Sequence, residues 1–202
     1  MSTMSKRGVA VSQGVRKLAV IAMLSAVATV LMALSFPIPF LIPTFVKMDF
    51  SELPALLAAF SMGPVSGVAV CLIKNLVNLF SSTTNGVGEL CNFLLGACLV
   101  VPAGLVYKYK KTRGGALMGA LIGAVVMAVG SVPVNYLISY PMYTLFMPLD
   151  TIIGMYQSLI PSVDGLVACL VIFNAPFTLL KALLDTALAF LVYKPLSPLL
   201  HK

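Results

Sequence analysis

The chain contains little charge. Of its 202 residues only 9% are Asp, Glu, Lys or Arg, whereas a soluble domain carries about 25%. Hydrophobic residues make up 60% of the chain, compared with about 45–50% in soluble domains. So few charges cannot cover a surface that faces water, and so apolar a chain is not disordered. We therefore expect an integral membrane protein that is solvated by lipid.

Groups that carry out chemistry are also scarce. The sequence has one histidine, His201, next to its last residue, and six scattered acids. It lacks the P-loop pattern G-x-x-x-x-G-K-[ST], the zinc-binding pattern H-E-x-x-H and the nucleophile pattern G-x-S-x-G. Neither an enzyme nor a resident cofactor is expected. If the protein transports a solute actively, the energy must come from a partner or an ion gradient.

Four cysteines are present, and none belongs to a C-x-x-C pair. All of them fall in apolar stretches, which favours small core residues over a disulfide or a metal site. They are Cys71, Cys91, Cys98 and Cys169.

Long apolar runs fill the chain and predict an all-α membrane protein with one domain, residues 1–202. The second run is short and ends at a Gly63-Pro64 turn. We expect six transmembrane helices, at about 18–36, 52–62, 65–80, 88–107, 115–140 and 163–193.

The basic residues predict the orientation. Ten of the thirteen Lys and Arg residues cluster near the two termini and between the fourth and fifth runs. Six spans place these clusters on one side, which the positive-inside rule makes cytoplasmic. Both termini are therefore predicted to be cytoplasmic. Because the bases lie at membrane boundaries, no nucleic-acid partner is expected.

Polar residues form a stripe on the last run. Asn174, Thr178, Lys181 and Asp185 follow the spacing i, i+4, i+7, i+11, which places them on one helical face. Charge inside a membrane is costly and usually marks function or pairing. The stripe is predicted to face the bundle interior, with at least part of it contacting a ligand. A structural Lys181–Asp185 pair is the alternative for those two residues.

Other polar residues are predicted at the same depth, in the outer half of the membrane. Lys74 and Asn78 lie on the third run, Glu89 and Asn92 open the fourth, and Asn135 lies on the fifth. Their convergence indicates a pocket for a flat, amphipathic organic molecule, with apolar faces and polar edges. Hydrogen bonding between helices is the alternative.

The segment between the first two runs, residues 36–51, combines three prolines with four phenylalanines. It cannot be helical throughout, yet it is too apolar to extend into water. We predict a lid that folds over the outer mouth. A passive interfacial belt of aromatic residues is the alternative.

The first run carries a small-x-x-x-small pattern at Ala22 and Ala26. Such a pattern lets another helix approach closely. That helix belongs either to a partner protein or to this bundle, and the pattern alone favours neither.

Three segments resemble the substrate-binding S components of energy-coupling factor (ECF) vitamin transporters, especially those of the riboflavin type. They are Phe36-Pro-Ile-Pro-Phe40, Lys47-Met-Asp-Phe-Ser-Glu-Leu-Pro54 and Met62-Gly-Pro-Val-Ser-Gly67. The resemblance implies the S-component fold in a bacterial plasma membrane. It also implies capture of riboflavin or a related flavin, and delivery inward with a membrane coupling protein that carries two ATPases. An S component for a queuosine precursor or pantothenate, or a stand-alone secondary transporter, is the alternative.

The resemblance also implies residue roles. Asn135 and Lys181 match flavin contacts of the riboflavin type, and Thr178 stands where that type has Asn. Asn174, one turn earlier, could supply the amide. Ala22 and Ala26 match the face that contacts the coupling protein. Phe40, Leu41, Thr44 and Phe45 belong to the gate and would pack on the flavin.

Overall fold

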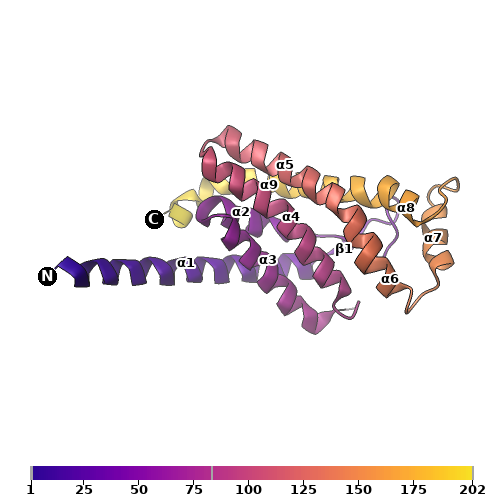
Figure 1. Cartoon of the computed structure of the whole chain (residues 1–202), viewed down its shortest axis with the longest axis horizontal. Helices are drawn as coiled ribbons and strands as arrows, with labels where there is room; N and C mark the ends of the chain where they lie inside the picture. The colour runs from indigo at the N-terminus through magenta and orange to yellow at the C-terminus, as the bar shows by residue number, and fades with distance from the viewer. Residues whose placement is uncertain (1, 83, 202) are drawn as a thin grey trace.

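Helices make up most of the structure, because lipid offers no partner for backbone N–H and C=O groups and a helix pairs them internally. The computed structural model describes residues 2–82 and 84–201, and the side chains of residues 13–82 and 84–193. The long helices run side by side, and α1 projects beyond the others (Figure 1). The described ends of α1 and α9 lie at the same end of the bundle (Figure 1).

The elements follow one another with short connections. In chain order they are α1 (Ser2–Ala33), β1 (Phe36–Pro37), β2 (Lys47–Met48), α2 (Glu52–Met62), α3 (Pro64–Asn78), the 3-10 turn η1 (Leu79–Ser81), α4 (Val87–Tyr109), α5 (Arg113–Val134), the π-helical turn η2 (Asn135–Ser139), α6 (Tyr140–Tyr143), α7 (Leu149–Gln157), α8 (Leu166–Cys169), the π-helical turn η3 (Leu170–Asn174) and α9 (Ala175–His201).

Five helical stretches are long and apolar enough to cross a membrane: Gln13–Ala33, Pro64–Ser81, Val87–Tyr109, Arg113–Tyr143 and Leu166–Tyr193. They correspond to five of the six predicted spans. The first ends at Ala33 rather than at residue 36, because a proline at 37 pushes the residue before it into extended backbone.

The predicted span at 52–62 forms a helix, but six spans are not confirmed. Helix α2 has 11 residues, which at 1.5 Å per residue is about half the thickness of the hydrocarbon core. Most of its residues are buried within the bundle. Gly63, with φ at +95°, reverses the chain after α2, and Pro64 then starts α3 without needing a hydrogen bond for its nitrogen.

Helices α4 and α5 pack closely along glycines. A Cβ atom at Gly123 would lie 2.3 Å from the carbonyl oxygen of Leu99, and one at Gly119 would lie 2.8 Å from that of Ala103. Only glycine permits this approach, as is usual where membrane helices pack through small residues.

The segment 36–51 contains no helix, as its prolines predict. Strands β1 and β2 pair antiparallel, with Phe36 opposite Met48. Between them Ile42 is fully buried, and it packs in a cluster with Ile152 of α7 and Phe173 of η3. The segment therefore folds back onto the bundle instead of extending away from it.

Candidate functional site

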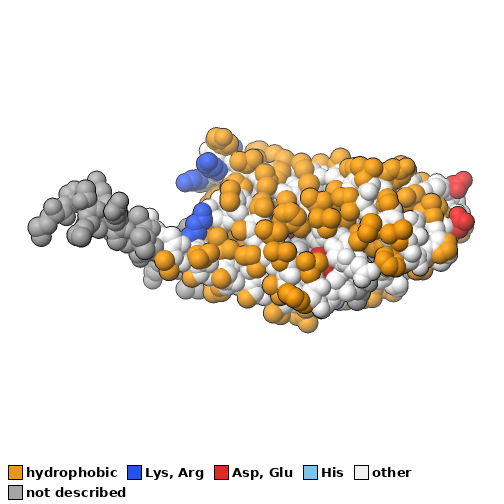
Figure 2. All heavy atoms as spheres, turned by 60° about the horizontal axis from the view of Figure 1, so that its bottom comes forward, with side chains coloured by type: hydrophobic (Ala, Val, Ile, Leu, Met, Phe, Trp, Pro, Cys, Tyr) orange, Lys and Arg blue, Asp and Glu red, His pale blue; other side chains and the backbone are white. Residues whose placement is uncertain are grey.

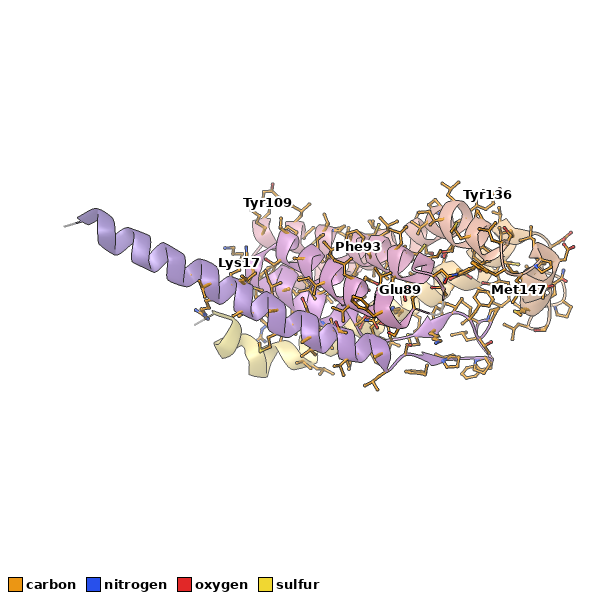
Figure 3. All side chains as sticks on the ribbon, turned by 90° about the horizontal axis from the view of Figure 1, so that it is seen from below. Lys17, Glu89, Phe93, Tyr109, Tyr136 and Met147 are labelled. Carbon is orange, nitrogen blue, oxygen red and sulfur yellow. The ribbon has the colours of Figure 1, made fainter. Side chains whose placement is uncertain are left out.

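A cavity of about 460 Å³ lies between the segment 36–51 and helices α1, α3, α4, α5 and α9. This volume falls within the range of about 300–1,000 Å³ for small-molecule pockets. Glu89, which lines the cavity, lies well away from Lys17 and Tyr109 at the basic end of the bundle (Figure 3). Six of the predicted ligand residues line it: Phe45, Asn78, Asn135, Asn174, Thr178 and Lys181.

Two of these residues lie on π-helical turns, which the sequence patterns did not predict. Asn135 begins η2 and Asn174 ends η3. In η2 the N–H of Tyr140 donates to the carbonyl of Asn135, five residues earlier. In η3 the N–H of Ala175 donates to the carbonyl of Leu170 in the same way. Such widened turns are frequent at functional sites.

Proline accounts for both turns. Pro141 directly follows Tyr140, and Pro176 directly follows Ala175. A proline lacks the N–H for an i to i−4 bond, and its ring displaces the carbonyl at i−4, which here belongs to Leu137 or Ile172. The helix widens by one residue at that carbonyl. The two prolines therefore set the positions of the two asparagine side chains against the cavity.

The Asn174 amide is held by two tyrosines. Its oxygen accepts a 2.8 Å hydrogen bond from the Tyr156 hydroxyl, and its nitrogen donates to the Tyr140 hydroxyl at 3.4 Å. The hydroxyls of Tyr140 and Tyr156 also hydrogen bond to each other. Burial raises the pKa of Tyr156, so this hydroxyl stays protonated. Helix α7 is thereby fixed to the head of α9.

The Asn135 amide is less constrained. Its oxygen accepts a 2.9 Å hydrogen bond from the Ser139 hydroxyl, four residues later on the same side of the wide turn. Among the hydrogen bonds of the described side chains, none uses its amide nitrogen. Because the residue lines the cavity, that nitrogen is available as a donor to a ligand.

Lys181 is paired with Asp49 and not with Asp185. The Lys181 ammonium donates a 2.7 Å hydrogen bond to the Asp49 carboxylate, which lies just after β2. The two oxygens of Asp185 are buried and have no hydrogen-bond partner among the described residues. The alternative Lys181–Asp185 pair is therefore wrong, because the lysine side chain extends toward the segment 36–51 instead.

The charge on Asp49 is set by two opposing effects. Burial favours the neutral carboxyl and would raise its pKa, but the nearby ammonium groups of Lys181 and Lys74 outweigh burial and lower the pKa to about 2. The Ser51 backbone N–H donates a further 2.9 Å hydrogen bond to the carboxylate. Asp49 is thus ionised and anchored at the wall of the cavity.

Lys74 lies apart from the cavity lining. Its buried ammonium donates to the Glu52 carboxylate at 2.6 Å and to the Ser51 hydroxyl at 2.6 Å. It therefore joins α3 to the start of α2. The sequence contained a signal for both pairs, since two lysines inside a membrane require acidic partners, and Asp49 and Glu52 adjoin the second run.

The gate residues separate into two groups. Phe45 lines the cavity and packs edge-on against Tyr143, with ring centroids 5.9 Å apart. Phe40 and Leu41 line a different, apolar pocket beside α9, and Thr44 is exposed. As the segment stands in this structure, only Phe45 of the four lines the cavity.

A second polar wall comes from the start of α4. The Glu89 carboxylate, predicted at this depth, accepts hydrogen bonds from the hydroxyls of Ser82 at 2.7 Å and Thr84 at 3.3 Å. Asn92, one turn further along α4, also lines the cavity. The cavity is therefore lined by hydrogen-bonding groups from several elements and by the aromatic rings of Phe45, Tyr140 and Tyr143.

Ala22 and Ala26 lie on the outward face of α1. Both are exposed, whereas Leu24 and Ala28 on the other face are buried against the bundle. The internal-packing alternative for this pair therefore finds no support within the chain.

Comparison with known proteins adds a further observation. The family described as "ECF transporter, substrate-specific component" matches residues 16–193. The chain is 35% identical over 187 residues to the riboflavin transporter RibU of Staphylococcus aureus (strain TCH60), with 93% of each protein covered. It is 32% identical to the riboflavin transporter FmnP of Bacillus subtilis (strain 168), with 91% of this chain and 93% of that protein covered.

A solved structure has the same fold. It is described as "Structure and mechanism of the S component of a bacterial ECF transporter" and superposes with a TM-score of 0.72 at 34% identity. The match covers 92% of this chain and 98% of that one.

Proposed function

The chain belongs to the family of substrate-specific components of ECF transporters, and we propose that its own substrate is riboflavin. The observation that carries the proposal is the cavity, where amide, hydroxyl and ammonium groups surround aromatic rings. Riboflavin has a flat tricyclic ring with a polar edge and a polyol chain, so it needs such a mixture. The two curated relatives, both riboflavin transporters by name, support the same choice.

The polar edge of the flavin would lie against α5 and α9. The unused amide nitrogen of Asn135 and the ammonium of Lys181 would donate to ring oxygens and nitrogens, and Thr178 would add a hydroxyl. Asn174 would act chiefly through the tyrosines that it holds, because both ends of its amide are already bonded. Phe45 would cover the ring.

The remaining predicted contacts need a different arrangement. Phe40, Leu41 and Thr44 would reach the flavin only if the segment 36–51 shifted on binding. Lys74 would support the site indirectly, since its ammonium is bonded to Glu52 and Ser51.

The topology that fits this role has six membrane segments in one domain, residues 1–202, with the short α2 as the second. Both termini would be cytoplasmic, because the exposed basic residues Arg16, Lys17 and those of the α4–α5 turn adjoin the helix ends on that side. The cavity would then open toward the outside of the bacterial plasma membrane.

Delivery inward would depend on other proteins. The sequence has no P-loop, so ATP hydrolysis must be supplied by a separate module of a coupling membrane protein and two ATPases. The exposed Ala22 and Ala26 of α1 would contact the coupling protein.

Titration of the purified chain with riboflavin tests the substrate. Flavin fluorescence should be quenched as the ring enters the aromatic cavity, with saturation at one flavin per chain. Pantothenate and a queuosine precursor should not compete. No quenching at micromolar riboflavin, together with binding of another vitamin, would contradict the proposal. Uptake in cells that lack the ECF module would instead indicate a stand-alone transporter.

A further inference from the structure

Another cavity lies at the opposite, basic end of the bundle. It encloses about 350 Å³ and is separate from the candidate flavin site. Four helices contribute to its walls. The lining residues are Phe60 of α2, Tyr107 of α4, Arg113 and Ala116 of α5, and Ala189, Phe190 and Tyr193 of α9.

Most of this cavity is an apolar slot. The ring of Phe60 packs edge-on against Tyr107 with centroids 5.4 Å apart, and it lies 6.2 Å from the ring of Phe190. Ala116 and Ala189 are both buried, and their small side chains leave room beside the rings. A slot of this kind accepts a hydrocarbon chain.

The slot lies beside surface that faces lipid. Leu117 follows Ala116 and is 47% exposed, and Leu191 follows Phe190 and is 72% exposed. In a membrane protein such exposed leucines contact acyl chains. The helices that line the slot therefore also face lipid, so acyl chains of the surrounding leaflet lie close to it.

The rim of the slot is positively charged. Arg113 is the first residue of α5, so its guanidinium lies beside the positive end of a 22-residue helix. Lys110 is exposed on the α4–α5 turn, three residues before it. None of the ion pairs formed by the described side chains involves Arg113. Figure 2 shows basic side chains gathered at this end of the molecule and acidic ones at the other.

We propose that this cavity binds one anionic phospholipid, with an acyl chain against Phe60 and Phe190 and its phosphate at Arg113. A soluble anion would leave the aromatic slot empty, whereas a zwitterionic lipid would gain less from the basic rim. Anionic phospholipid satisfies both parts of the cavity, and basic pockets between membrane helices are known to bind such head groups. The bound lipid would fix α5 against α2 and α9 at this end.

Lipid retention tests the proposal. The full chain is reconstituted in nanodiscs containing phosphatidylglycerol and phosphatidylcholine, extracted into detergent, and its retained lipids are counted by mass spectrometry. The wild type should retain about one phosphatidylglycerol. Arg113→Gln should reduce retention on the order of tenfold, because the charge-assisted phosphate contact is lost. Phe190→Ala should also reduce it, because it removes one wall of the slot.

Lys111→Gln is the matched control, since it removes the same charge from an exposed position outside the lining. It should retain the lipid. Equal loss from Arg113→Gln and Lys111→Gln would show general surface attraction and overturn the proposal. Retention by both Arg113→Gln and Phe190→Ala would overturn it as well. If the variants retain lipid but no longer co-purify with the coupling protein, the proposal is also overturned, because the cavity would then be a protein-docking site. Helicity by circular dichroism checks that each variant is folded.

Discussion

Lys181 of α9 donates a 2.7 Å hydrogen bond to the Asp49 carboxylate across 132 residues of sequence. Both residues line the candidate flavin cavity. Asp49 belongs to the segment that folds over the cavity, and Lys181 belongs to the polar stripe beneath it. The lysine proposed to contact the flavin is therefore also the one that holds the segment in place, which links recognition of the ligand to closure of the cavity.

Replacing either Asp49 or Lys181 alone should destabilise the protein more than replacing both residues together. Asp49→Asn or Lys181→Met alone leaves a buried charge without its partner, which costs about 3–5 kcal/mol. The double variant removes both charges and should recover part of that loss. Thermal unfolding of the four proteins in detergent gives the coupling free energy. Additive losses would contradict a direct interaction.

The same four proteins separate the two roles of Lys181 in binding. Lys181→Met should weaken riboflavin binding at least tenfold even in the Asp49→Asn background, because its own contact with the flavin is lost. If the double variant binds flavin as tightly as Asp49→Asn alone, Lys181 only positions the segment.

Acid should release the segment at a predictable pH. The folded pKa of Asp49 is about 2, below its ordinary value of 3.8, so ionised Asp49 stabilises the fold at higher pH. This contribution is complete above about pH 5 and is lost as the pH falls through 3.8 toward 2. The difference in unfolding free energy between the wild type and Asp49→Asn should follow that course. A difference that already declines between pH 7 and 5 would contradict the assignment.

Lys74 should behave differently from Lys181, although both are interior lysines. Lys74→Met leaves Glu52 buried without its partner, so we expect a loss of about 3–5 kcal/mol in the free energy of unfolding. Riboflavin affinity, measured by fluorescence on the folded fraction, should change less than threefold. Glu52→Gln in the same background should restore part of the stability. If Lys74→Met greatly weakens riboflavin binding without lowering stability, Lys74 contacts the flavin directly.

The two asparagines on π-helical turns should also differ. Asn174→Leu leaves Tyr140 and Tyr156 bonded only to each other, so one of their two hydroxyl protons loses its acceptor, which costs about 1–3 kcal/mol of stability. Asn135→Leu removes only one bond of the Ser139 hydroxyl, which keeps Cys91 as a partner, so it should weaken riboflavin binding with a smaller effect on the unfolding temperature. Equal effects on stability would show that Asn135 is structural.

Helical spacing predicted much of the site, because the last helix keeps a regular α-helical period after residue 174. Asn174, Thr178 and Lys181 share a face in the structure, as their spacing requires. The position of Asn135 on the fifth run placed it among the converging polar residues, and the family resemblance then implied its contact with the flavin. Spacing could not predict which acid pairs with Lys181, because Asp185 is close in sequence whereas Asp49 is brought near only by the folded segment.

The positions of the helix ends and turns were less predictable. Hydropathy marks 52–62 as apolar in the same way as a span, and it does not distinguish burial in protein from contact with lipid. The π-helical turns depend on where Pro141 and Pro176 fall within continuous helices, and there a proline produces either a break or a wider turn. Neighbouring helices decide between these outcomes.

The outward face of α1 provides the sharpest test of coupling to a partner. Small residues at this face let a helix of the partner pack closely against α1, and Ala22→Trp places a large side chain in that contact. Because Ala22 is exposed, the variant should fold and bind riboflavin as the wild type does. Uptake into cells that contain the ECF module should fall at least tenfold.

Val27→Trp is the matched control for this variant. Val27 is 46% exposed on the same helix, but about 120° around the axis from the middle of the alanine face. A tryptophan there should spare both binding and uptake. If Ala22→Trp and Val27→Trp reduce uptake equally, bulk anywhere on α1 interferes with transport. If neither reduces it, the coupling protein docks on another face, even though the chain still binds its vitamin.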